Sequence, residues 1–582
     1  MAGKERSAFL IVDVGESTTK AALVKRENGA FRLKGVSEAE TTTDAPVLDV
    51  TSGIEKAVSA LGKKTGEKLM GSEGPIGATL LCSSGDGGGL YMMVAGVIGM
   101  ISGESAQRAA LGAGAHLIGV FSKDNPKPEH IVVDEMRSAR PDMFLLAGGT
   151  DGGAFSQVLE MAKTIEEADV RPRFGEGYRL PVIYAGNVDA RQRVEETLTE
   201  KNYATRTVDN VRPVIDRENL GPAREAIYDS YMEHVIVHSP GYDRLAKWVG
   251  RPIIPTQAAI GKILYAYAQM HSVNLLAVNI GGSTTDVYSV YNGVFNRSLN
   301  AEVGLTYGIM NVLKTVGVEG LADWMPGEVD ERRIRNIIGN LMIRQRNGFD
   351  ADERLIRGAV AREAIRIGVE EHKRLASRLK GVTTARTIAD MFAQSLEATY
   401  LDMKNTRSVI GMGGVFNETL EEAALILMDS LEPTYFTEMY VDRTGLTPHT
   451  GMLLEDAPEA ALTLFSGEVL QRIGTCVAPS GKTSRHEAVA IKLTRQNGQT
   501  VEDSVGFGDI RTIKLLDGEI CKVEATPGRG LDLGRGKGKP VEAKVIGGQL
   551  GLIVDARGRP FEKKRESMHK WSEALRPGGA RG

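Results

Sequence analysis

The sequence has few cysteines, and its apolar stretch at residues 76–102 is interrupted by small and polar residues. It contains three cysteines in 582 residues. Cys82, Cys476 and Cys521 are far apart and cannot all pair, so a disulfide framework is excluded and reduced thiols are expected. The apolar stretch is broken by Gly, Ser and Asp, and the amino terminus lacks the apolar core of a signal peptide. These absences favour a cytoplasmic protein without a membrane span.

The sequence also lacks an excess of charge of either sign. Lysine and arginine total 71 against 75 aspartates and glutamates, a formal net charge of −4. Nothing therefore attracts the whole chain to nucleic acid or to an acidic membrane surface. The composition, 42% hydrophobic and 25% charged, is that of an ordinary soluble protein. Because single cores rarely grow beyond about 250–300 residues, a chain of this length should form several domains.

Two segments of the chain share one design. Residues 9–20 run from an apolar strand into Asp13, a Gly/Ser/Thr turn and Lys20. Residues 275–286 repeat the arrangement. A small turn after a buried strand exposes backbone N–H groups and hydroxyls to an anion, and a carboxylate at the strand end can hold a metal or a water. Two such turns facing each other would clamp a polyphosphate.

A third glycine-rich element follows at residues 409–415, Val-Ile-Gly-Met-Gly-Gly-Val. Glycines after an apolar strand let the backbone approach a flat ligand closely. The order of two phosphate turns and then a Gly-Gly element resembles that of the actin, sugar-kinase and Hsp70 ATPase superfamily. The resemblance implies an α/β protein with a two-lobed actin/Hsp70-like (ribonuclease H-like) ATPase fold, an inserted α/β domain and a small C-terminal β domain.

Four further segments narrow the resemblance. They are Leu-Leu-Cys-Ser-Ser-Gly-Asp-Gly-Gly-Gly-Leu (80–90), Leu-Leu-Ala-Gly-Gly-Thr-Asp-Gly-Gly (145–153), Pro-Val-Ile-Tyr-Ala-Gly-Asn (181–187) and Leu-Thr-Pro-His-Thr-Gly-Met-Leu (446–453). Over most of residues 7–470 the chain resembles the MutL/GlmL family, the accessory proteins of adenosylcobalamin-dependent glutamate (methylaspartate) mutase. Residues 551–560 are similar to the tail of longer members. The resemblance implies ATP and Mg²⁺ as cofactors and cobalamin-dependent mutase subunits as partners.

ATP chemistry gives each residue of these elements an expected role. Hydrolysis needs charge neutralised on the β/γ-phosphates, a metal that bridges them and a water held in line. Asp13 and Asp286 would orient Mg²⁺ through its waters, and Lys20 would add a point charge. The turns would supply N–H and hydroxyl donors from Gly15, Ser17, Thr18, Thr19, Gly281, Gly282, Ser283, Thr284 and Thr285. Gly411, Gly413 and Gly414 would pass close to adenosine.

Two positions depart from the superfamily pattern. Asn279 stands where an Asp is usual, and it can orient a water but cannot act as an anionic base or neutralise metal charge. Glu16 adds a negative charge beside the expected phosphates. We therefore expect nucleotide binding with slow hydrolysis at most, which suits a conformational switch better than a metabolic kinase. The variant Asn279→Asp is expected to hydrolyse ATP faster at similar nucleotide affinity.

Changes in composition and in the spacing of apolar residues divide the chain into five expected parts. Residues 7–74 open the first ATPase lobe, and residues 216–469 hold the remainder of the ATPase core. Between them, residues 75–215 alternate apolar runs with helical stretches, as in a parallel sheet covered on both faces. Residues 470–560 carry the short alternating runs and hairpin signals of a small β domain. The basic tail at residues 561–582 is expected to be disordered.

The expected insert at 75–215, whose first strand is predicted at Ile76–Cys82, could in principle bind cobalamin itself. The Asp-x-His-x-x-Gly motif that supplies the cobalt-ligating histidine in many B12 domains is missing from it. His116 stands at the start of an apolar run, where a packed or capping histidine is expected. We therefore expect the insert to dock a partner.

Three smaller features complete the expectations. Apolar residues at 3/4 spacing predict helices within 330–403, among them Ile334 to Met342 and Ile388 to Leu396. The charged run Arg362–Lys380 is expected to be a solvated helix face. A Gly/Arg/Lys loop at 527–540 favours a solvated hairpin over contact with a phosphate or an acidic partner.

The sequence is compatible with more than one function. The leading hypothesis is a nucleotide-driven accessory protein whose lobe motion acts on a mutase-type client, for example by releasing damaged cobalamin. The alternative is a small-molecule kinase or a hydantoinase/oxoprolinase-like hydrolase of the same superfamily, although no acidic base stands out. An electron-donating activator of acyl-CoA dehydratases would need cluster-ligating cysteines at a subunit interface, and three scattered cysteines do not supply them. The sequence leaves open whether the protein forms a homodimer.

Overall fold

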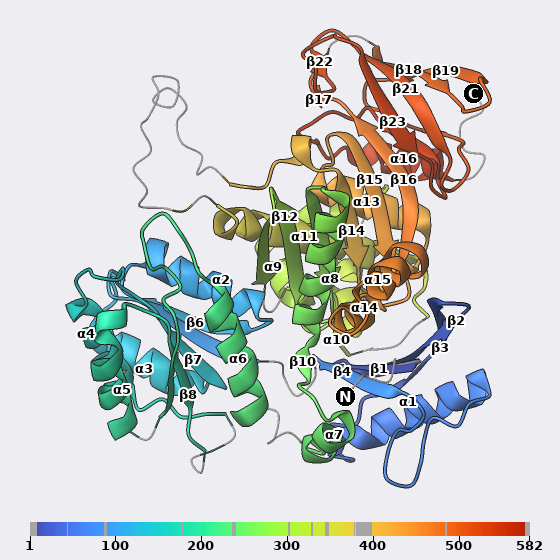
Figure 1. The fold of residues 1–582 in the computed structure, drawn as a ribbon. Helices are drawn as coiled ribbons and strands as arrows, with labels where there is room; N and C mark the ends of the chain where they lie inside the picture. Colours follow the sequence, from blue (N-terminus) through green and yellow to red (C-terminus); the bar gives the residue numbers. More distant parts are fainter. Residues whose placement is uncertain are drawn as a thin grey trace. The chain divides into compact units, whose positions relative to one another are not determined.

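A computed structural model describes residues 8–43, 45–85, 90–173, 175, 178–201, 203–234, 240–300, 303–327, 330–343, 348–377, 379, 399–483 and 486–576. The chain forms two compact units (Figure 1). Unit 1 comprises Met1–Ala266, Ser377–Ala398 and Leu446–Glu468, and unit 2 comprises Tyr267–Ala376, Thr399–Gly445 and Val469–Gly582. Each unit has buried hydrophobic cores of its own.

The first sheet of unit 1 is built around the strand that precedes the first predicted turn. Strand β1 (Ala8–Val14) is antiparallel to β2 (Thr18–Glu27), which is antiparallel to β3 (Ala30–Glu40). On its other side β1 is parallel to β4 (Thr79–Ser84), and the short β10 (Ile254–Pro255) completes the order β10-β4-β1-β2-β3. The strand expected to open the insert at Ile76–Cys82 therefore belongs to this sheet, because an apolar run does not by itself specify which strand it pairs with.

Helix α1 (Val50–Thr65) packs on strands β2 and β3. It begins where the side chain of Asp49 accepts a hydrogen bond from Thr51 N, and it ends at Gly66, which adopts the left-handed conformation at φ 72°. Its apolar residues Val50, Ile54, Ala57, Val58 and Leu61 recur at helical spacing and are buried in the core of this sheet. The helix thus covers one face of the strands that carry the first turn.

The insert is a five-stranded parallel sheet within unit 1. Its strands are β5 (Tyr91–Gly96), β6 (His116–Ser122), β7 (Met143–Leu146), β8 (Pro181–Tyr184) and β9 (Ala204–Thr207), in the order β6-β5-β7-β8-β9. One face carries α2 (Glu104–Gly112) and α6 (Gly221–His234), and the other carries α3 (Glu129–Ala139), α4 (Ser156–Ala168) and α5 (Arg191–Glu200) (Figure 1). Alternate residues of β5 are buried in separate cores, as the sequence predicts for a sheet covered on both faces. His116 is buried against the ring of Tyr91, which is the environment of a packed histidine.

The main sheet of unit 2 repeats the topology of the first sheet. Its strands are β13 (Val294–Asn300), β12 (Thr285–Tyr291), β11 (Leu275–Ile280), β14 (Ser408–Met412), β15 (Tyr435–Asp442), β16 (Leu470–Ala478), β24 (Leu552–Asp555) and β20 (Ile510–Ile513), in that order. As in unit 1, the first strand in the chain is antiparallel to the second, the second to the third, and the first is parallel to the fourth. The duplicated sheet confirms the predicted two-lobed actin-like arrangement of strands.

Helices α9 (Ile309–Ala322), α10 (Glu331–Ile343), α11 (Ala351–Leu375) and α13 (Leu420–Leu431) contribute to the core of unit 2. Helices α10 and α11 confirm the first part of the helical prediction for residues 330–403. The expected helix from Ile388 to Leu396 lies outside the described residues. Among the described residues, no helix combines the length and the apolar character that a membrane crossing needs.

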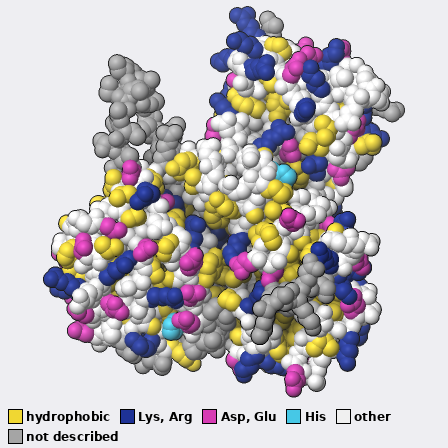
Figure 2. Space-filling view, viewed as in Figure 1, with side chains coloured by type: hydrophobic (Ala, Val, Ile, Leu, Met, Phe, Trp, Pro, Cys, Tyr) yellow, Lys and Arg dark blue, Asp and Glu magenta, His cyan; other side chains and the backbone are white. Residues whose placement is uncertain are grey.

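The C-terminal β region of unit 2 contains a four-stranded antiparallel sheet. Its order is β19 (Thr500–Gly506), β18 (Glu487–Thr494), β21 (Ile520–Pro527) and β23 (Val541–Ile546). Within the Gly/Arg/Lys loop, the short strand β22 (Leu531–Asp532) pairs with β17 (Ser480–Gly481). Asp532 holds this loop by accepting hydrogen bonds from the backbone N–H groups of Gly534 and Gly536. The loop cations Arg529, Arg535, Lys537 and Lys539 are exposed, and Lys and Arg side chains gather on this part of the surface (Figure 2).

The predicted disorder of the basic tail is wrong for residues 561–576. Helix α16 (Met568–Leu575) buries Trp571 and Leu575, and Trp571 Nε1 donates a hydrogen bond to the carbonyl of Gly508 at 2.8 Å. The physical reason is that Phe561, Met568, Trp571 and Leu575 supply apolar surface that a count of charges does not reveal. Residues 577–582 lie outside the described part of the chain.

Candidate functional site

The two predicted turns are closed by the same backbone hydrogen bond. The bonds are Gly15 N to Thr18 O at 3.1 Å and Gly281 N to Thr284 O at 2.9 Å. The flanking strands also share one register, since Asp13 lies opposite Lys20 and Asn279 lies opposite Asp286. Asp13 is therefore the positional counterpart of Asn279, and Lys20 is the counterpart of Asp286.

Asp13 is anchored through one of its carboxylate oxygens. Oδ1 accepts hydrogen bonds from Ser83 Oγ and from Thr256 Oγ1, both at 2.6 Å. Burial raises the pKa of the Asp13 carboxyl, while the two hydroxyls and the Lys20 ammonium oppose that rise. The second oxygen has no hydrogen-bond partner within the part of the chain that the structure describes. A fixed carboxylate with one oxygen left over suits a Mg²⁺ ion that keeps most of its waters.

His449 contacts the same hairpin. It lies in α14 (Thr447–Leu453), and its Nε2 is 3.2 Å from the carbonyl oxygen of Lys20. Burial and the Lys20 ammonium lower the pKa of His449 to about 3, so the imidazole is neutral. A Cβ on Gly451 would lie 1.9 Å from the carbonyl oxygen of Ala259, which explains why this segment needs a glycine. In the sequence, residues 446–453 stand out only because they resemble a segment of the MutL/GlmL family. No sequence pattern predicts their contact with Lys20.

Two of the predicted phosphate donors point inward. Thr19 is fully buried and its hydroxyl is 2.9 Å from that of Thr41. Thr285 is fully buried and donates to the carbonyl oxygen of Val303 at 2.8 Å. Their side chains therefore do not have the role that the sequence predicted, because both residues already belong to a strand whose side chains alternate between faces. The other turn residues, Gly15, Ser17, Thr18, Gly281, Gly282, Ser283 and Thr284, are exposed or half-buried.

The second turn is braced from behind by the segment that follows β13. The carbonyl oxygen of Gly282 accepts hydrogen bonds from Thr306 N at 2.9 Å and Gly308 N at 3.2 Å, and that of Gly281 accepts one from Leu305 N at 3.0 Å. These bonds occupy the carbonyl oxygens on that side of the turn. The braced turn is therefore fixed in position before any ligand arrives, which lowers the entropy cost of binding.

Asp286 does not fit the metal-orienting role predicted for it. Its Oδ1 accepts hydrogen bonds from Nε and Nη2 of Arg297 at 2.9 and 2.5 Å, and both side chains are 1% exposed. Burial raises the pKa of the Asp286 carboxyl, and Arg297 and the Asn279 amide oppose that rise. A carboxylate that is buried and neutralised in this way cannot contact the waters of a Mg²⁺ ion. The sequence missed Arg297, whose only signal was a lone cation in an expected strand.

The three glycines of the third element differ in whether a side chain would fit at their positions. A Cβ on Gly411 would be 2.8 Å from the ring of Phe416, and one on Gly413, at φ 111°, would be 2.1 Å from the carbonyl oxygen of Ile280. Packing inside the protein therefore explains these two glycines. A Cβ on Gly414 would have no atom within 4 Å. Of the three, Gly414 is the one whose backbone is open to a ligand.

A cavity of about 420 Å³ has Val415, the residue after Gly414, in its wall, and we call it the cavity beside Gly414. Its walls are Ala351, Arg354, Leu355, Arg357 and Gly358 of α11, Val415, Glu418 and Thr419, Glu421 and Glu422 of α13, and Ser572 and Arg576. Strand β14 pairs with β11, so this cavity and the second turn follow neighbouring strands of one sheet. The volume lies within the range of small-molecule pockets, about 300–1,000 Å³.

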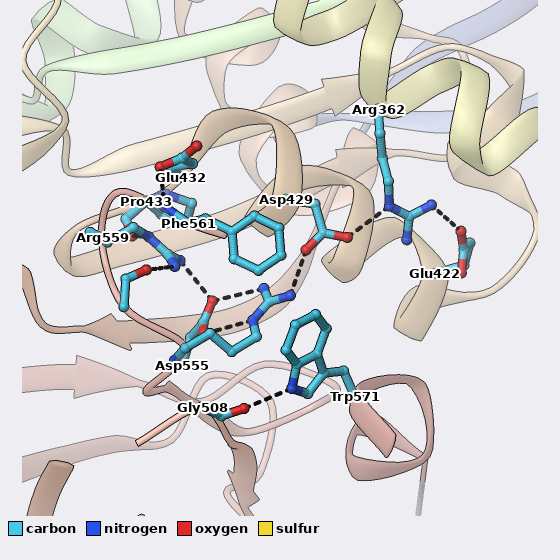
Figure 3. Close-up of polar contacts among 12 residues, drawn as sticks. Arg362, Glu422, Asp429, Glu432, Pro433, Gly508, Asp555, Arg559, Phe561 and Trp571 are labelled. Carbon is cyan, nitrogen blue, oxygen red and sulfur yellow. Dashed lines mark hydrogen bonds and ion pairs between the residues drawn. The ribbon is translucent and has the colours of Figure 1, made fainter. Parts of the chain in front are cut away.

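The charged residues of α11 form the predicted solvated face only in part, since Glu370, Glu371 and Arg374 are exposed but Arg362 and Glu363 are buried. Arg362 is buried and bonds both Asp429 and Glu422 (Figure 3). Gly358 leaves room for this pair, because a Cβ there would be 2.5 Å from Glu422 Oε1. The acidic partners lie on α13, far away in the sequence, so the charges of α11 alone could not reveal their burial.

The duplicated sheet, the matched turns and the cavity beside Gly414 define a protein with the fold of the actin, sugar-kinase and Hsp70 class of ATPases. The chain belongs to the MutL protein family, whose model matches residues 9–469. This confirms the resemblance predicted from the four signature segments.

Known proteins that resemble the chain include one of the same name as the family. Protein MutL of Clostridium tetanomorphum is 28% identical over 492 residues, which are 79% of this chain and 98% of that protein. Nucleotide-free acetone carboxylase is 12% identical, with a TM-score of 0.33 over 86% of this chain and 81% of its own. Component A of (R)-2-hydroxyglutaryl-CoA dehydratase from Acidaminococcus fermentans is 10% identical, with a TM-score of 0.28 over 78% of this chain and 99% of its own.

Proposed function

We propose that the protein is an ATP-binding accessory protein that reactivates an adenosylcobalamin-dependent mutase, such as glutamate mutase. The observation that carries the proposal is the cavity beside Gly414, which follows the strand next to the second turn. A nucleoside would occupy this cavity, and the glycine-rich turns would contact its phosphates. Membership of the MutL family supports a mutase as the client.

The proposal assigns the phosphates to the groups of the turns that are open to a ligand. Lys20 would add positive charge, and Asp13 would orient a Mg²⁺ ion through the oxygen that Ser83 and Thr256 leave unused. Mg²⁺, when bound, would neutralise the charge of the β- and γ-phosphates. Backbone N–H groups and hydroxyls would come from Ser17, Thr18, Gly282, Ser283 and Thr284, because the N–H groups of Gly15 and Gly281 already close the two turns.

Slow hydrolysis is part of the proposal. Asn279 cannot accept the proton of an attacking water as a carboxylate does. Its neighbour Asp286 is occupied by Arg297, so it does not supply the missing base. A protein that holds ATP for long periods suits a switch between two conformations, and the insert and the C-terminal β region would contact the client.

Calorimetry of the Lys20→Ala variant tests nucleotide binding. Lys20 is partly exposed and lies 4.0 Å from Glu38, so its loss should leave the fold intact. We expect the variant to bind Mg-ATP more weakly by on the order of 1.5–3 kcal/mol, the range for a lost charge-assisted contact. Unchanged affinity would reject the contact between Lys20 and the phosphates.

Reactivation of the client tests the cellular role. A cobalamin-dependent mutase from the same cell is inactivated by turnover, this protein is added with ATP, Mg²⁺ and fresh adenosylcobalamin, and recovered activity is followed. We expect recovery, together with tighter client binding in one nucleotide state by about 1–3 kcal/mol and an equal effect of the client on nucleotide affinity. No recovery, with equal client binding in the ATP, ADP and nucleotide-free states, would reject the proposal.

A further inference from the structure

Helix α16 forms part of the wall of the cavity beside Gly414. Ser572 and Arg576 line the cavity together with α11 and α13. The helix is firmly attached, since Trp571 and Leu575 are buried and Trp571 donates a hydrogen bond to Gly508 (Figure 3). The wall of the candidate nucleoside site therefore includes a segment beyond residue 469, where the match to the family model ends.

A cluster of aromatic rings and Arg557 fixes the helix to unit 2. The guanidinium of Arg557 lies 4.5 Å from the ring centre of Phe561 and 4.8 Å from that of Trp571. Phe561 in turn stacks on Trp324, with ring centres 5.9 Å apart and planes 14° from parallel. Such cation–π and stacking contacts are strongest where water is excluded, as it is here. The position of α16 is thus set by buried contacts.

Buried ion pairs connect the same cluster to the cavity wall. Asp429 accepts a hydrogen bond from Arg557 through Oδ1 and one from Arg362 through Oδ2, each at 2.7 Å. Arg362 also donates to Glu422, which lines the cavity, at 2.8 Å (Figure 3). Asp555 pairs with Arg557 from the other side. Because buried ion pairs of this kind are costly to break, they hold the C-terminal segment in a fixed position against the cavity wall.

Arg576 differs from the other two arginines of the cavity. Arg354 donates to the carbonyl of Phe349, and Arg357 pairs with Glu418 and lies 3.7 Å from the ring centre of Phe349. The side chain of Arg576 is exposed and has no hydrogen bond or ion pair with any residue in the described ranges. A planar guanidinium can stack on a base and donate to its ring nitrogens or to ribose hydroxyls.

The charges of the wall favour the nucleoside over the phosphates as the partner of Arg576. The cavity has three glutamates, Glu418, Glu421 and Glu422, against three arginines, so it has no net positive charge to attract a polyphosphate. We propose that α16 is a functional wall of the nucleoside site and that Arg576 binds the base or ribose of the ligand. This inference rests on the proposed nucleotide binding.

Calorimetry with three ligands tests the inference. Wild type, Arg576→Ala and Lys570→Ala are titrated with ADP, adenosine and tripolyphosphate. Lys570 is the matched control, because it is a cation of the same helix that pairs with Asp509 and does not line the cavity. We expect Arg576→Ala to weaken the binding of ADP and of adenosine by about tenfold or more, as for a lost contact with a charged group. The affinity for tripolyphosphate should not change. Lys570→Ala should bind all three ligands like wild type.

The possible failures are distinguishable. If wild type binds no ADP, the proposed nucleotide binding fails and the inference fails with it. If wild type binds ADP and Arg576→Ala binds it equally well, the inference alone is overturned. Equal loss of tripolyphosphate and adenosine would overturn the assignment to the nucleoside. Amide hydrogen exchange gives an independent reading: adenosine should slow exchange in residues 568–575 of wild type, and unchanged exchange there would contradict the role of α16.

Discussion

Asp286 and Arg297 form an ion pair in which each side chain is 1% exposed. The pair joins neighbouring strands β12 and β13, and Asn279 completes it by hydrogen bonding to the carboxylate from β11. An amide suits this position because it can donate to Asp286, whereas a carboxylate there would face a second carboxylate. The departure of Asn279 from the superfamily pattern thus has a structural reason.

This relationship changes what we expect of Asn279→Asp. The new carboxylate would compete with Asp286 for Arg297, so we expect a loss of stability of about 1–3 kcal/mol near neutral pH, in place of faster ATP hydrolysis. The like charge would raise the pKa of the new carboxyl in the folded state. Its contribution to stability is then present at low pH and lost as the pH rises through that pKa, so the defect should shrink in acid.

Urea unfolding of Asn279→Asp near neutral pH and in mild acid measures both effects. Asn292→Asp is the matched control, since Asn292 is the exposed turn residue between β12 and β13. The control should unfold like wild type at each pH. Wild-type stability of Asn279→Asp at neutral pH, with increased ATP turnover, would support the original expectation instead.

Removing one partner of the buried pair should be more costly than removing both. Asp286→Ala leaves the guanidinium of Arg297 buried without its counter-ion, and we expect a loss of about 3–5 kcal/mol. The double variant Asp286→Leu/Arg297→Met removes both charges and should recover much of that loss. Denaturant titration of Asp286→Leu, Arg297→Met and the double variant gives the coupling energy. Additive effects of the two substitutions would show that the pair does not act as a unit.

Neighbouring glycines of the third element should respond differently to alanine. Gly413→Ala places a Cβ against the carbonyl oxygen of Ile280 at a positive φ, so we expect a loss of stability of about 2 kcal/mol or more. Gly414→Ala meets no atom within 4 Å and should fold like wild type. If the backbone of Gly414 approaches the nucleoside, the added methyl group should weaken ADP binding. Thermal unfolding and calorimetry of the two variants separate the effects, and normal ADP affinity of Gly414→Ala would argue against that approach.

The parts of the site that are local in sequence could be predicted from it. The strands before both turns are apolar runs, and the Gly/Ser/Thr segments that follow them form the matched turns. The inward orientation of Thr19 and Thr285 could not be predicted with the same ease, because it depends on the residue at which strand alternation begins. A shift of one residue exchanges the two faces.

The features that the sequence did not predict depend on contacts between residues that are far apart in the chain. Arg297, Arg362 and Asp429 are charged residues whose burial depends on partners in distant segments. Strand β4 was assigned to the wrong sheet for the same reason, since its apolar residues fit either one. The folded tail depends on Trp571 meeting Arg557 and Phe561, which no local pattern encodes.

His372 should make unit 2 sensitive to acid. It lies in α11, fully buried, with Nδ1 2.8 Å from Ser298 Oγ and Nε2 2.7 Å from Ser289 Oγ. Burial lowers the pKa of His372 from 6.5 to about 3. Its contribution to stability is therefore complete above pH 6.5 and is lost as the pH falls from 6.5 toward 3, because the unfolded chain binds a proton that the folded one does not. Between about pH 7 and about pH 5 the loss should be on the order of 2 kcal/mol.

The measurement needs a signal from unit 2 alone. Trp324 and Trp571 belong to unit 2 and Trp248 to unit 1, so a Trp248→Phe background makes fluorescence report the unfolding of unit 2. In that background His372→Gln, which keeps a polar side chain but cannot titrate, should be less stable at neutral pH and lose less of its stability in acid. His569→Gln is the control, since His569 is exposed on α16 and should leave the wild-type pH dependence unchanged. An identical pH dependence in His372→Gln and wild type would show that His372 is not the group responsible.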